Sequence, residues 1–437
     1  MAASDFDLAL HSIDKPQQSD LDRCVHCGLC LNACPTYREL RVEMDSPRGR
    51  IYQMVQVSAG APISESYIEH IDLCLACRGC ETACPSGVQY GRLVEAARAE
   101  IENKIQRPWR PRVLRWMVFQ KLLPSRRNLE IAGGLLNLYE ASGLKRLAAL
   151  PGFLPSRLRE LDSLAPPIET PFFFGYYGKT LPAEGERRHR VAFLGGCIAN
   201  LSFARLNEAT VRVLQKNGCE VSIPADQGCC GALHVHAGIR DEARKLARRN
   251  IDALLEGGFD AILTNAGGCG STLKEYWELL EHDPEYAEKA RHFSRLIKDV
   301  NEFLVSIDAA PPMRVLPLTV TYQDSCHLAH GQKIRSAPRK LLSSIPGLEL
   351  REMPLSDLCC GSAGIYNVVH TGMAMSLLKK KMDSVNATGA PVIAASNPGC
   401  MLQLRAGVKK FGHGQRVAHV IEILDEAYRR EKSKEPA

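Results

Sequence analysis

The sequence has 437 residues, which is long enough for two or three domains that each bury a core of their own. Its 45% hydrophobic and 24% charged residues are ordinary for a soluble globular protein, and a net charge of +6 is too mild for this length to favour nucleic acid as a partner. The 17 cysteines are the unusual feature. The N-terminal residues lack the basic region and apolar core of a secretory signal, so we expect a cytoplasmic protein. There, grouped cysteines are more often metal ligands or redox groups than disulfides.

The first predicted module, residues 15–104, contains two tight cysteine runs. The run "CVHCGLCLNACPTY" opens at residue 24, and "CLACRGCETACPSG" repeats its spacing from residue 74. The C-x2-C-x2-C spacing lets one loop give three thiolates to a [4Fe–4S] cluster, and in two-cluster ferredoxins the fourth cysteine, the one before proline, ligates the other cluster. A structural zinc site, the alternative, usually pairs two Cys-x2-Cys knuckles and has no use for the remaining thiols. We therefore expect two [4Fe–4S] clusters, the first held by Cys24, Cys27, Cys30 and Cys84 and the second by Cys74, Cys77, Cys80 and Cys34.

Residues 105–190 are expected to form a linker that is basic at its start and rich in prolines towards its end. The segment 104–127, "KIQRPWRPRVLRWMVFQKLLPSRR", combines tryptophans and other apolar residues with arginines and lysines. Such a basic amphipathic segment can lie in the headgroup region of a membrane without spanning it. Its apolar face can equally pack on the core of this protein or on a partner, and both alternatives stay open. No apolar run reaches the roughly 18 residues that a membrane span requires.

From residue 191 onward, short apolar β-prone runs alternate with amphipathic helical stretches, which predicts α/β domains with parallel sheets. Four cysteines recur in this zone at offsets of 129, 130, 130 and 131 residues, so we expect two copies of one unit, residues 191–310 and 311–437. Each copy has a Cys-Cys-Gly signature, "GCCGA" at 228–232 and "LCCGS" at 358–362. The cysteines of the first copy are Cys197, Cys229, Cys230 and Cys269, and their counterparts are Cys326, Cys359, Cys360 and Cys400.

These eight cysteines are expected just beyond the carboxyl ends of parallel strands, which meet at one edge of a sheet. Four thiols per copy would then lie close together and bind a further iron–sulfur cluster or act as redox thiols. The alternative is a vestigial or packing role, which is common for isolated buried cysteines. Nearby histidines, His234, His236 and His327, are interpreted as hydrogen-bonded side chains rather than as ligands or proton carriers. No catalytic residue is assigned, because no Ser-His-Asp order, paired carboxylate motif or flavin fingerprint stands out.

Two ferredoxin runs followed by two Cys-Cys-Gly units in a chain of this length resemble the iron–sulfur subunits of bacterial glycolate oxidase. The resemblance rests on "CVHCGLCLNACPTYRELRVEMDSPRGRIYQM" at 24–54, "CLACRGCETACPSGVQY" at 74–90, "GCCGA" at 228–232 and "DLCCGSAGIYN" at 357–367. The stretch "SPRGRIY" at 46–52 separates the chain from generic ferredoxins, because no cluster ligand explains it. The expected architecture is an α+β multidomain protein, with an N-terminal α-helical two-cluster ferredoxin module followed by a duplicated α/β Cys-Cys-Gly domain.

The resemblance also implies what the chain does. Such a subunit receives electrons from FAD-containing flavoprotein partners that oxidise glycolate to glyoxylate, with D-lactate as a further candidate substrate. It passes the electrons to membrane quinone or another acceptor of the respiratory chain. The substrate chemistry would take place on the partners, and this chain would be cytoplasmic and peripherally associated with the inner membrane.

Two other families share the architecture and remain alternatives. The iron–sulfur subunit of anaerobic glycerol-3-phosphate dehydrogenase has the same order of modules. The catalytic subunits of heterodisulfide reductase use Cys-Cys-Gly units for thiol–disulfide chemistry, and their units end in Cys-x2-Cys, which gives a fifth thiol. Thr272 and Gln403 stand where that thiol would be, which weakens the disulfide reductase interpretation.

Overall fold

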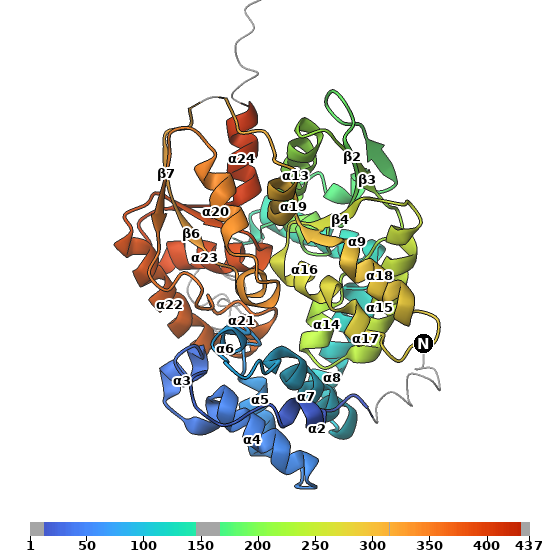
Figure 1. Ribbon diagram of the computed structural model, residues 1–437, viewed down its shortest axis with the longest axis vertical. Helices are drawn as coiled ribbons and strands as arrows, with labels where there is room; N and C mark the ends of the chain where they lie inside the picture. The colour runs from blue at the N-terminus through green and yellow to red at the C-terminus, as the bar shows by residue number, and fades with distance from the viewer. Residues whose placement is uncertain (1–12, 146–166, 314, 430–437) are drawn as a thin grey trace, which may run out of the picture.

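The computed structural model describes residues 13–145, 167–313 and 315–429. A helical N-terminal module lies below two α/β repeats that stand side by side, as Figure 1 shows in blue, in green to yellow, and in orange to red. Part of the linker (146–166) and the end of the second repeat (430–437) lie outside the described residues.

The ferredoxin module is built of short helices joined by the two cysteine loops. Serine side chains start two of them: the Ser46 hydroxyl accepts a hydrogen bond from the Gly49 N–H at 2.9 Å, and the Ser64 hydroxyl accepts one from the Tyr67 N–H at 3.1 Å. Such caps satisfy N–H groups that have no partner inside the helix. The helices are α2 (Gln18–Leu21), α3 (Pro35–Leu40), η1 (Glu43–Asp45), α4 (Pro47–Ser58), α5 (Glu65–Asp72), α6 (Gly79–Thr82) and α7 (Tyr90–Lys104).

The linker begins with two consecutive helical segments whose apolar residues are largely exposed. Trp109 is 65% exposed, Leu114 58% and Trp116 46%, whereas Phe119 and Leu123 are buried. Packing on the core of this protein therefore accounts for only part of the apolar residues of 104–127. None of the helices in the described ranges is long and apolar enough to cross a bilayer. The linker elements are α8 (Trp109–Trp116), the π-helical turn η2 (Met117–Leu122), α9 (Arg126–Ala141) and η3 (Phe173–Tyr176).

Each repeat contains a parallel sheet with the same strand order. The first sheet runs β3-β2-β4-β5 and the second runs β7-β6-β8-β9, so each strand has its counterpart at the same place. The central strands β4 and β8 are buried along their whole length, as expected where helices cover both faces. The strands are β2 (His189–Phe193), β3 (Cys219–Ile223), β4 (Ala261–Thr264), β5 (Ile297–Asp299), β6 (Leu318–Gln323), β7 (Leu348–Glu352), β8 (Val392–Ala395) and β9 (Arg416–His419).

The first sheet has an additional edge strand, β1 (Lys179–Leu181), which pairs antiparallel with β3. These residues belong to the predicted linker. The strand is short and largely exposed, so it lacks the alternation of apolar and polar residues by which a sequence predicts a strand. We propose on this ground that the first repeat begins near residue 179. The expected fold class, a helical module followed by a duplicated α/β domain, is confirmed.

The two repeats share one hydrophobic core, and helices of one repeat pack on helices of the other. Helix α24 (Val420–Arg429) of the second repeat packs on α13 (Ala204–Lys216) of the first, and α19 (Val300–Ser306) packs on α20 (Ser336–Ser343). The guanidinium of Arg212 binds both oxygens of the nearly fully buried Asp425 carboxylate, at 3.1 and 2.8 Å. Because this contact is bidentate and its acid is buried, it fixes the orientation of one repeat on the other. The remaining helices are α12 (Ala199–Ser202), α14 (Ala232–His236), α15 (Arg240–Leu255), α16 (Gly267–Lys274), α17 (Tyr276–Leu279), α18 (Ala287–Leu296), η4 (His327–Gly331), α21 (Tyr366–Val369), α22 (Thr371–Ala387) and α23 (Pro398–Phe411).

Candidate cluster sites and thiol cavity

The first three cysteines of the second run and the last cysteine of the first run line one small cavity. Cys34 reaches it from the start of α3, Cys74 and Cys77 come from the loop between α5 and α6, and Cys80 lies in α6. Arg50, Arg78 and Tyr90 are also in its wall, and the Tyr90 hydroxyl donates to the Cys74 sulfur at 3.7 Å. The cysteines that line this cavity are Cys34, Cys74, Cys77 and Cys80.

The "SPRGRIY" stretch supplies one of the two arginines that line this site. Arg50 is fully buried, and its guanidinium donates to the His70 carbonyl oxygen at 2.6 Å and to the Thr36 hydroxyl at 3.2 Å. Burial disfavours the charged form of Arg50, yet its electrostatic interactions with Cys74, Tyr90 and Asp45 hold its pKa above the usual value. A Cβ on Gly49 would stand 2.0 Å from the Glu43 carbonyl oxygen, so only glycine fits there. The stretch thus starts α4 and places a permanent positive charge beside four thiols.

The first cysteine run lies nearer to the surface. Cys27 is exposed, and Cys24, Cys30 and Cys84 are half-buried and pack against the core of the ferredoxin module. Burial raises the pKa of Cys30 to about 11, with a smaller contribution from the neighbouring Cys24.

Arg48 supports the loop of this first run. It donates to the His26 carbonyl oxygen at 3.1 Å and is paired with Glu43 at 2.8 Å. Gly28 has a φ of +82°, and a Cβ there would stand 2.7 Å from an Arg48 nitrogen. The loop therefore needs glycine at this position.

The Cys-Cys-Gly cysteines follow the carboxyl ends of the strands. Cys197 comes after β2 and Cys326 after β6, while Cys269 and Cys400 lie in the first turns of α16 and α23, directly after β4 and β8. The adjacent pairs follow the neighbouring strands β3 and β7. Parallel strands bring these positions to one edge of each sheet, where open α/β folds place their sites.

Within each repeat the four thiols interact in series, and we call each series a thiol chain. In the first repeat the order is Cys197, Cys229, Cys230 and Cys269, and in the second it is Cys326, Cys359, Cys360 and Cys400. The interaction with the Cys229 thiol, followed by burial, raises the pKa of Cys197 well above that of an ordinary thiol. The interaction with Cys360, followed by burial, raises the pKa of Cys400 in the same way. Each repeat thus gathers four soft potential ligands in a buried place.

All eight of these thiols line a single cavity of about 550 Å³ between the two repeats. Cys74 of the ferredoxin module also lines it, so this residue borders both the cavity of the second cysteine run and the thiol cavity. Much of the remaining wall is apolar and comes from η2 and α21, with Val118, Leu122, Val368 and Val369 among its residues.

The second cysteine run makes direct contact with the second repeat. Leu75 packs with Cys359 and Tyr366 in one buried cluster, and the half-buried Cys77 and Cys326 pack against that cluster. The Tyr366 hydroxyl donates to the Leu73 carbonyl oxygen at 3.0 Å. The buried cysteine site of the ferredoxin module and the thiols of the second repeat are therefore neighbours in the folded chain.

Thr272 and Gln403 stand where a fifth thiol of each Cys-Cys-Gly unit would be, and both make hydrogen bonds within the protein. The Thr272 hydroxyl donates to the Gly268 carbonyl oxygen at 3.5 Å, which is its ordinary helical acceptor, and Gln403 accepts from Asn367 at 3.1 Å.

His234 is fully buried, and its Nε2 donates to the Phe119 carbonyl oxygen at 2.7 Å. The hydrogen bond that the sequence analysis expects for His234 is therefore present.

The donor sets suit iron–sulfur clusters in their chemistry. Each grouping gives four sulfur atoms, which is the ligand type of [4Fe–4S] clusters. In the parts of the chain that the structure describes, no three His, Cys, Asp or Glu side chains converge on the position of a single metal ion. A cluster differs from an ion, because its thiolates stand apart around several iron corners.

Family comparisons match the modules seen in the structure. The family model of the 4Fe–4S dicluster domain matches residues 20–88, and that of the cysteine-rich domain matches residues 191–274 and 320–405. A third family model, the linker region of the glycolate oxidase iron–sulfur subunit, matches residues 110–165.

Similar proteins cover nearly the whole chain. The probable glycolate oxidase iron–sulfur subunit of Bacillus subtilis is 41% identical over 95% of this chain and 95% of that protein. The glycolate oxidase iron–sulfur subunit of Escherichia coli is 36% identical over 94% of this chain and 95% of that protein. Lactate utilization protein A of Oceanobacillus iheyensis is 28% identical over 54% of this chain and 96% of that protein. With the two-cluster module, the linker and both cysteine-rich repeats in the same order, the chain belongs to the family of glycolate oxidase iron–sulfur subunits.

Proposed function

We propose that this chain is the electron-transfer subunit of an oxidoreductase complex that oxidises glycolate to glyoxylate on FAD-containing partner subunits and delivers the electrons to membrane quinone. The observation that carries the proposal is the shared wall at Cys74, which joins the ferredoxin module to the thiol cavity. The full-length similarity to glycolate oxidase subunits supports glycolate as the substrate of the complex, and the similarity to a lactate utilization protein supports D-lactate as a second one.

The eight ferredoxin cysteines would hold two [4Fe–4S] clusters, which supply one-electron carriers when bound. We assign Cys34 to the second cluster because it lines one cavity with Cys74, Cys77 and Cys80, and by the same crossed rule Cys84 to the first. The Cys-Cys-Gly thiols would hold further iron–sulfur clusters at the thiol cavity.

Electrons would enter at the first cysteine run. Cys27 is exposed, and it is flanked by Val25, which is 66% exposed, and by Leu29, which is 60% exposed. Exposed apolar side chains beside a redox site suit a protein partner, because docking there would bury them and shorten the path to the flavin. We place the flavoprotein on this face.

Electrons would leave from the thiol cavity to quinone. The mouth of the cavity carries the exposed apolar residues Ile365, Val368 and Val369, and η2, which also lines the cavity, continues into the exposed tryptophans of α8. An apolar cavity beside an apolar surface suits a quinone, which is a lipid-soluble molecule.

The same surface supports a peripheral membrane contact. Arginines such as Arg110 and Arg112 stand among the exposed Trp109, Leu114 and Trp116, and this combination favours anionic lipid. A substitution of Arg115 would not test the membrane contact alone, because this side chain also holds the fold together. It donates to the Ala237 carbonyl oxygen at 3.0 Å and pairs with Glu102 at 3.0 Å.

Vesicle sedimentation tests the membrane contact. The complex is expected to sediment with anionic vesicles at low salt and to be released at high salt, and Trp109→Glu with Trp116→Glu is expected to abolish binding. Met313→Glu, at a residue that is 88% exposed in another part of the chain, serves as the control. Equal sedimentation of the tryptophan variant would place the membrane contact elsewhere.

Reconstitution tests the electron route as a whole. The purified complex is expected to reduce a soluble quinone analogue with glycolate as electron donor, and removal of this subunit should leave glycolate oxidation by the flavoproteins with artificial dyes but abolish quinone reduction. If the flavoproteins alone reduce quinone at the same rate, the chain is not the relay.

A further inference from the structure

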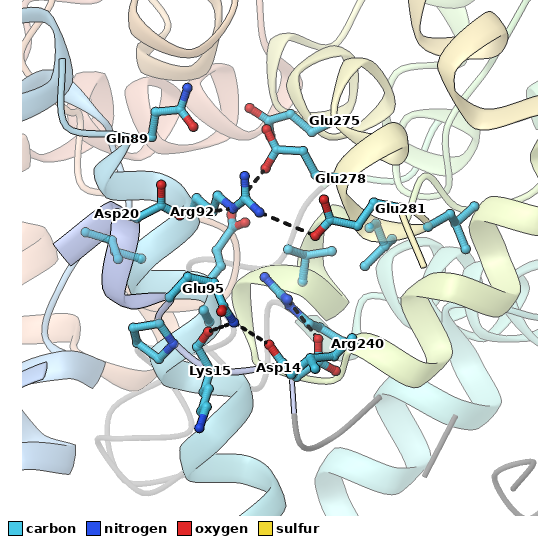
Figure 2. A pocket seen from close by; sticks show the side chains of 18 of the residues that line it. Asp14, Lys15, Asp20, Gln89, Arg92, Glu95, Arg240, Glu275, Glu278 and Glu281 are labelled. Atoms are coloured by element: carbon cyan, nitrogen blue, oxygen red, sulfur yellow. Dashed lines mark hydrogen bonds and ion pairs between the residues drawn. The ribbon is translucent and has the colours of Figure 1, made fainter. Parts of the chain in front are cut away.

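A cavity of about 540 Å³ lies where the end of α7, the helix α8 and the start of α15 meet. Arg107 and Arg115 line both this cavity and the thiol cavity, so the two are neighbours. Arg240 also lines a neighbouring polar cavity, where Figure 2 shows it beside Asp14. The exposed Arg112 is a further lining residue, so the cavity opens to solvent. We call it the arginine cavity, after these four arginines.

The wall of the arginine cavity carries more positive than negative charge. Glu102 is shared by two arginines, Arg107 at 2.9 Å and Arg115 at 3.0 Å, and Glu242 pairs with Lys245 at 2.7 Å. The acids of the wall are thus already engaged by cations of the protein, and the cations outnumber them. The cationic residues of the wall are Arg107, Arg112, Arg115, Arg240 and Lys245, and the acidic ones are Glu102, Asp241 and Glu242.

Arg112 differs from the other arginines of this wall, each of which has an acidic partner within the protein. Among the described residues Arg112 makes no ion pair, and its side chain is exposed. A guanidinium can bind two oxygens of a phosphate group at once. The arginine cavity therefore presents one uncompensated cation to an anionic ligand.

The helix that holds Arg112 also holds the exposed tryptophans. Residues three or four positions apart are neighbours on a helix surface, so Arg112 stands beside Trp109 and Trp116. Trp116 also lines the arginine cavity, and both tryptophans are exposed. Tryptophans lie at the level of the lipid headgroups when a helix rests on a membrane. A membrane contact through α8 would therefore bring the mouth of the arginine cavity to the headgroups.

The rest of the wall indicates which headgroup fits. Amide side chains can donate to hydroxyl groups and accept from them, and three amides line the cavity: Asn103, Gln106 and Gln120. The acids of the wall would repel a carboxylate on the ligand, and an ammonium on the ligand would find these acids already paired. A phosphodiester with one negative charge and a hydroxyl-bearing head meets both conditions. Phosphatidylglycerol is such a lipid, whereas phosphatidylserine has the same net charge but adds a carboxylate and an ammonium.

We propose that the arginine cavity binds the headgroup of phosphatidylglycerol. The phosphodiester lies at Arg112, the glycerol hydroxyls face the amides of the wall, and the acyl chains pass over Trp116 into the bilayer. The inference rests on the membrane contact of the proposed function and adds a site and a lipid class to it.

Two vesicle types of equal charge separate a headgroup site from general attraction to a membrane. Vesicles of phosphatidylcholine contain either phosphatidylglycerol or phosphatidylserine at the same molar fraction, and the complex is sedimented with each at low salt. Binding to the phosphatidylglycerol vesicles is expected to be about tenfold tighter, the size of one hydrogen bond to a charged group. Arg112→Gln is expected to remove this preference. Equal binding of the unaltered complex to both vesicle types would overturn the proposal.

Arg110→Gln is the matched control. Arg110 lies on the same helix and is exposed, and its guanidinium carbon is 5.3 Å from the centroid of the Trp109 ring, but it is not a lining residue of the arginine cavity. Its loss should weaken binding to both vesicle types about fivefold, the general contribution of one arginine near an anionic surface, and leave the preference intact. Loss of the preference in both variants would show that it reflects the charge of α8 and not the cavity.

A soluble lipid tests the headgroup site without a membrane. Calorimetric titration of the complex with dihexanoyl phosphatidylglycerol, below its micelle concentration, is expected to show binding that Arg112→Gln removes. Inorganic phosphate should bind at least about tenfold more weakly, because it lacks the glycerol hydroxyls. Equal binding of inorganic phosphate would assign the cavity to a soluble anion and refute the lipid.

The two assays also distinguish the site from the membrane contact. If the complex sediments equally with both vesicle types and Trp109→Glu with Trp116→Glu abolishes this, only the headgroup site fails. If the complex sediments with neither, the membrane contact of the proposed function fails, and the calorimetric titration decides the headgroup site by itself.

Discussion

The two cysteine runs of the ferredoxin module have the same spacing and very different surroundings. In the first run Cys27 is exposed, and exposed Val25 and Leu29 stand beside it. In the second run Cys74 and Cys80 are buried, a fully buried arginine lies beside them, and the adjacent Leu75 packs against the second repeat. Identical spacing thus gives two sites that differ in solvent access, charge and neighbours.

The contrast shows that spacing defines a set of cluster ligands, whereas the environment of that set defines its place in an electron-transfer route. Cluster potentials respond to net charge, hydrogen bonds to sulfur and solvent exposure, all of which differ between the two runs. The exposed site can be reached by a partner, whereas the buried site can exchange electrons only inside the chain. The order of electron flow proposed here, from the first run to the second and then to the thiol cavity, follows from that contrast.

The largest effect is expected when the cysteine that one run contributes to the cluster of the other run is replaced by serine. Cys34→Ser is expected to remove the cluster of the second run, and Cys84→Ser that of the first, each with loss of about four of roughly eight ferredoxin-type irons. Because one site is exposed, the cluster that survives in Cys34→Ser should react with a bulky oxidant faster than the one that survives in Cys84→Ser. Anaerobic EPR with iron counting measures both outcomes. Loss of the first-run cluster in Cys34→Ser would refute the crossed assignment.

A second variant interrupts the route beyond the buried run. Cys360→Ser is expected to keep both ferredoxin clusters and the assembly of subunits but to lower quinone reduction at least about tenfold, which corresponds to a barrier increase of about 1.4 kcal/mol. The fold should persist, because the sheets are built from other residues. Cys219→Ser, at a fully buried cysteine that belongs to neither thiol chain, is the matched control. Unchanged iron content and unchanged turnover in Cys360→Ser would leave the Cys-Cys-Gly units as a platform without a redox role.

The two arginines of "SPRGRIY" test whether burial strengthens the electrostatic effect of a nearby cation on each cluster. Arg50→Met removes a fully buried cation beside the second run, and it is expected to lower the reduction potential of that cluster, because added electrons lose a stabilising positive charge. Arg48→Met, whose side chain is 31% exposed beside the first run, should shift its cluster less, because solvent screens the charge.

Potentiometric EPR titration reads both potentials in each variant. Removal of Arg50 also leaves the buried Asp45 without one partner and is expected to cost about 3 kcal/mol of unfolding free energy. The titration should therefore be made on folded, cluster-loaded protein. Equal shifts in the two variants would show that burial does not distinguish the two sites.

The smallest expected effect is on partner docking at the exposed run. Leu29→Glu should weaken binding of the reduced flavoprotein about tenfold, or about 1.4 kcal/mol, while both clusters keep their spectra. Leu355→Glu, at a residue 50% exposed in the second repeat, serves as the control. Equal affinity of the Leu29 variant in surface plasmon resonance would move the docking face away from the first run.

The modules, the cluster-type cysteines and the duplication can be predicted from the amino-acid sequence alone. Ligand spacing is a local property, since three cysteines of a run reach one cluster from a single loop, and the constant offset between copies needs no structure to be seen. The prediction that Cys-Cys-Gly cysteines follow strand ends also came from local pattern, because apolar β-prone runs end directly before them.

The contacts between these modules, in contrast, become visible only in the folded chain. The sequence left "SPRGRIY" without an explanation, because nothing near residue 50 shows that its arginine returns to Cys34 and Cys74. It also interpreted His236 as an ordinary hydrogen-bonded histidine, and its partner Glu95 lies 141 residues away on another module. Spacing along the chain records contacts within one loop or one helix, whereas a shared cavity is made by side chains from segments that only packing brings together.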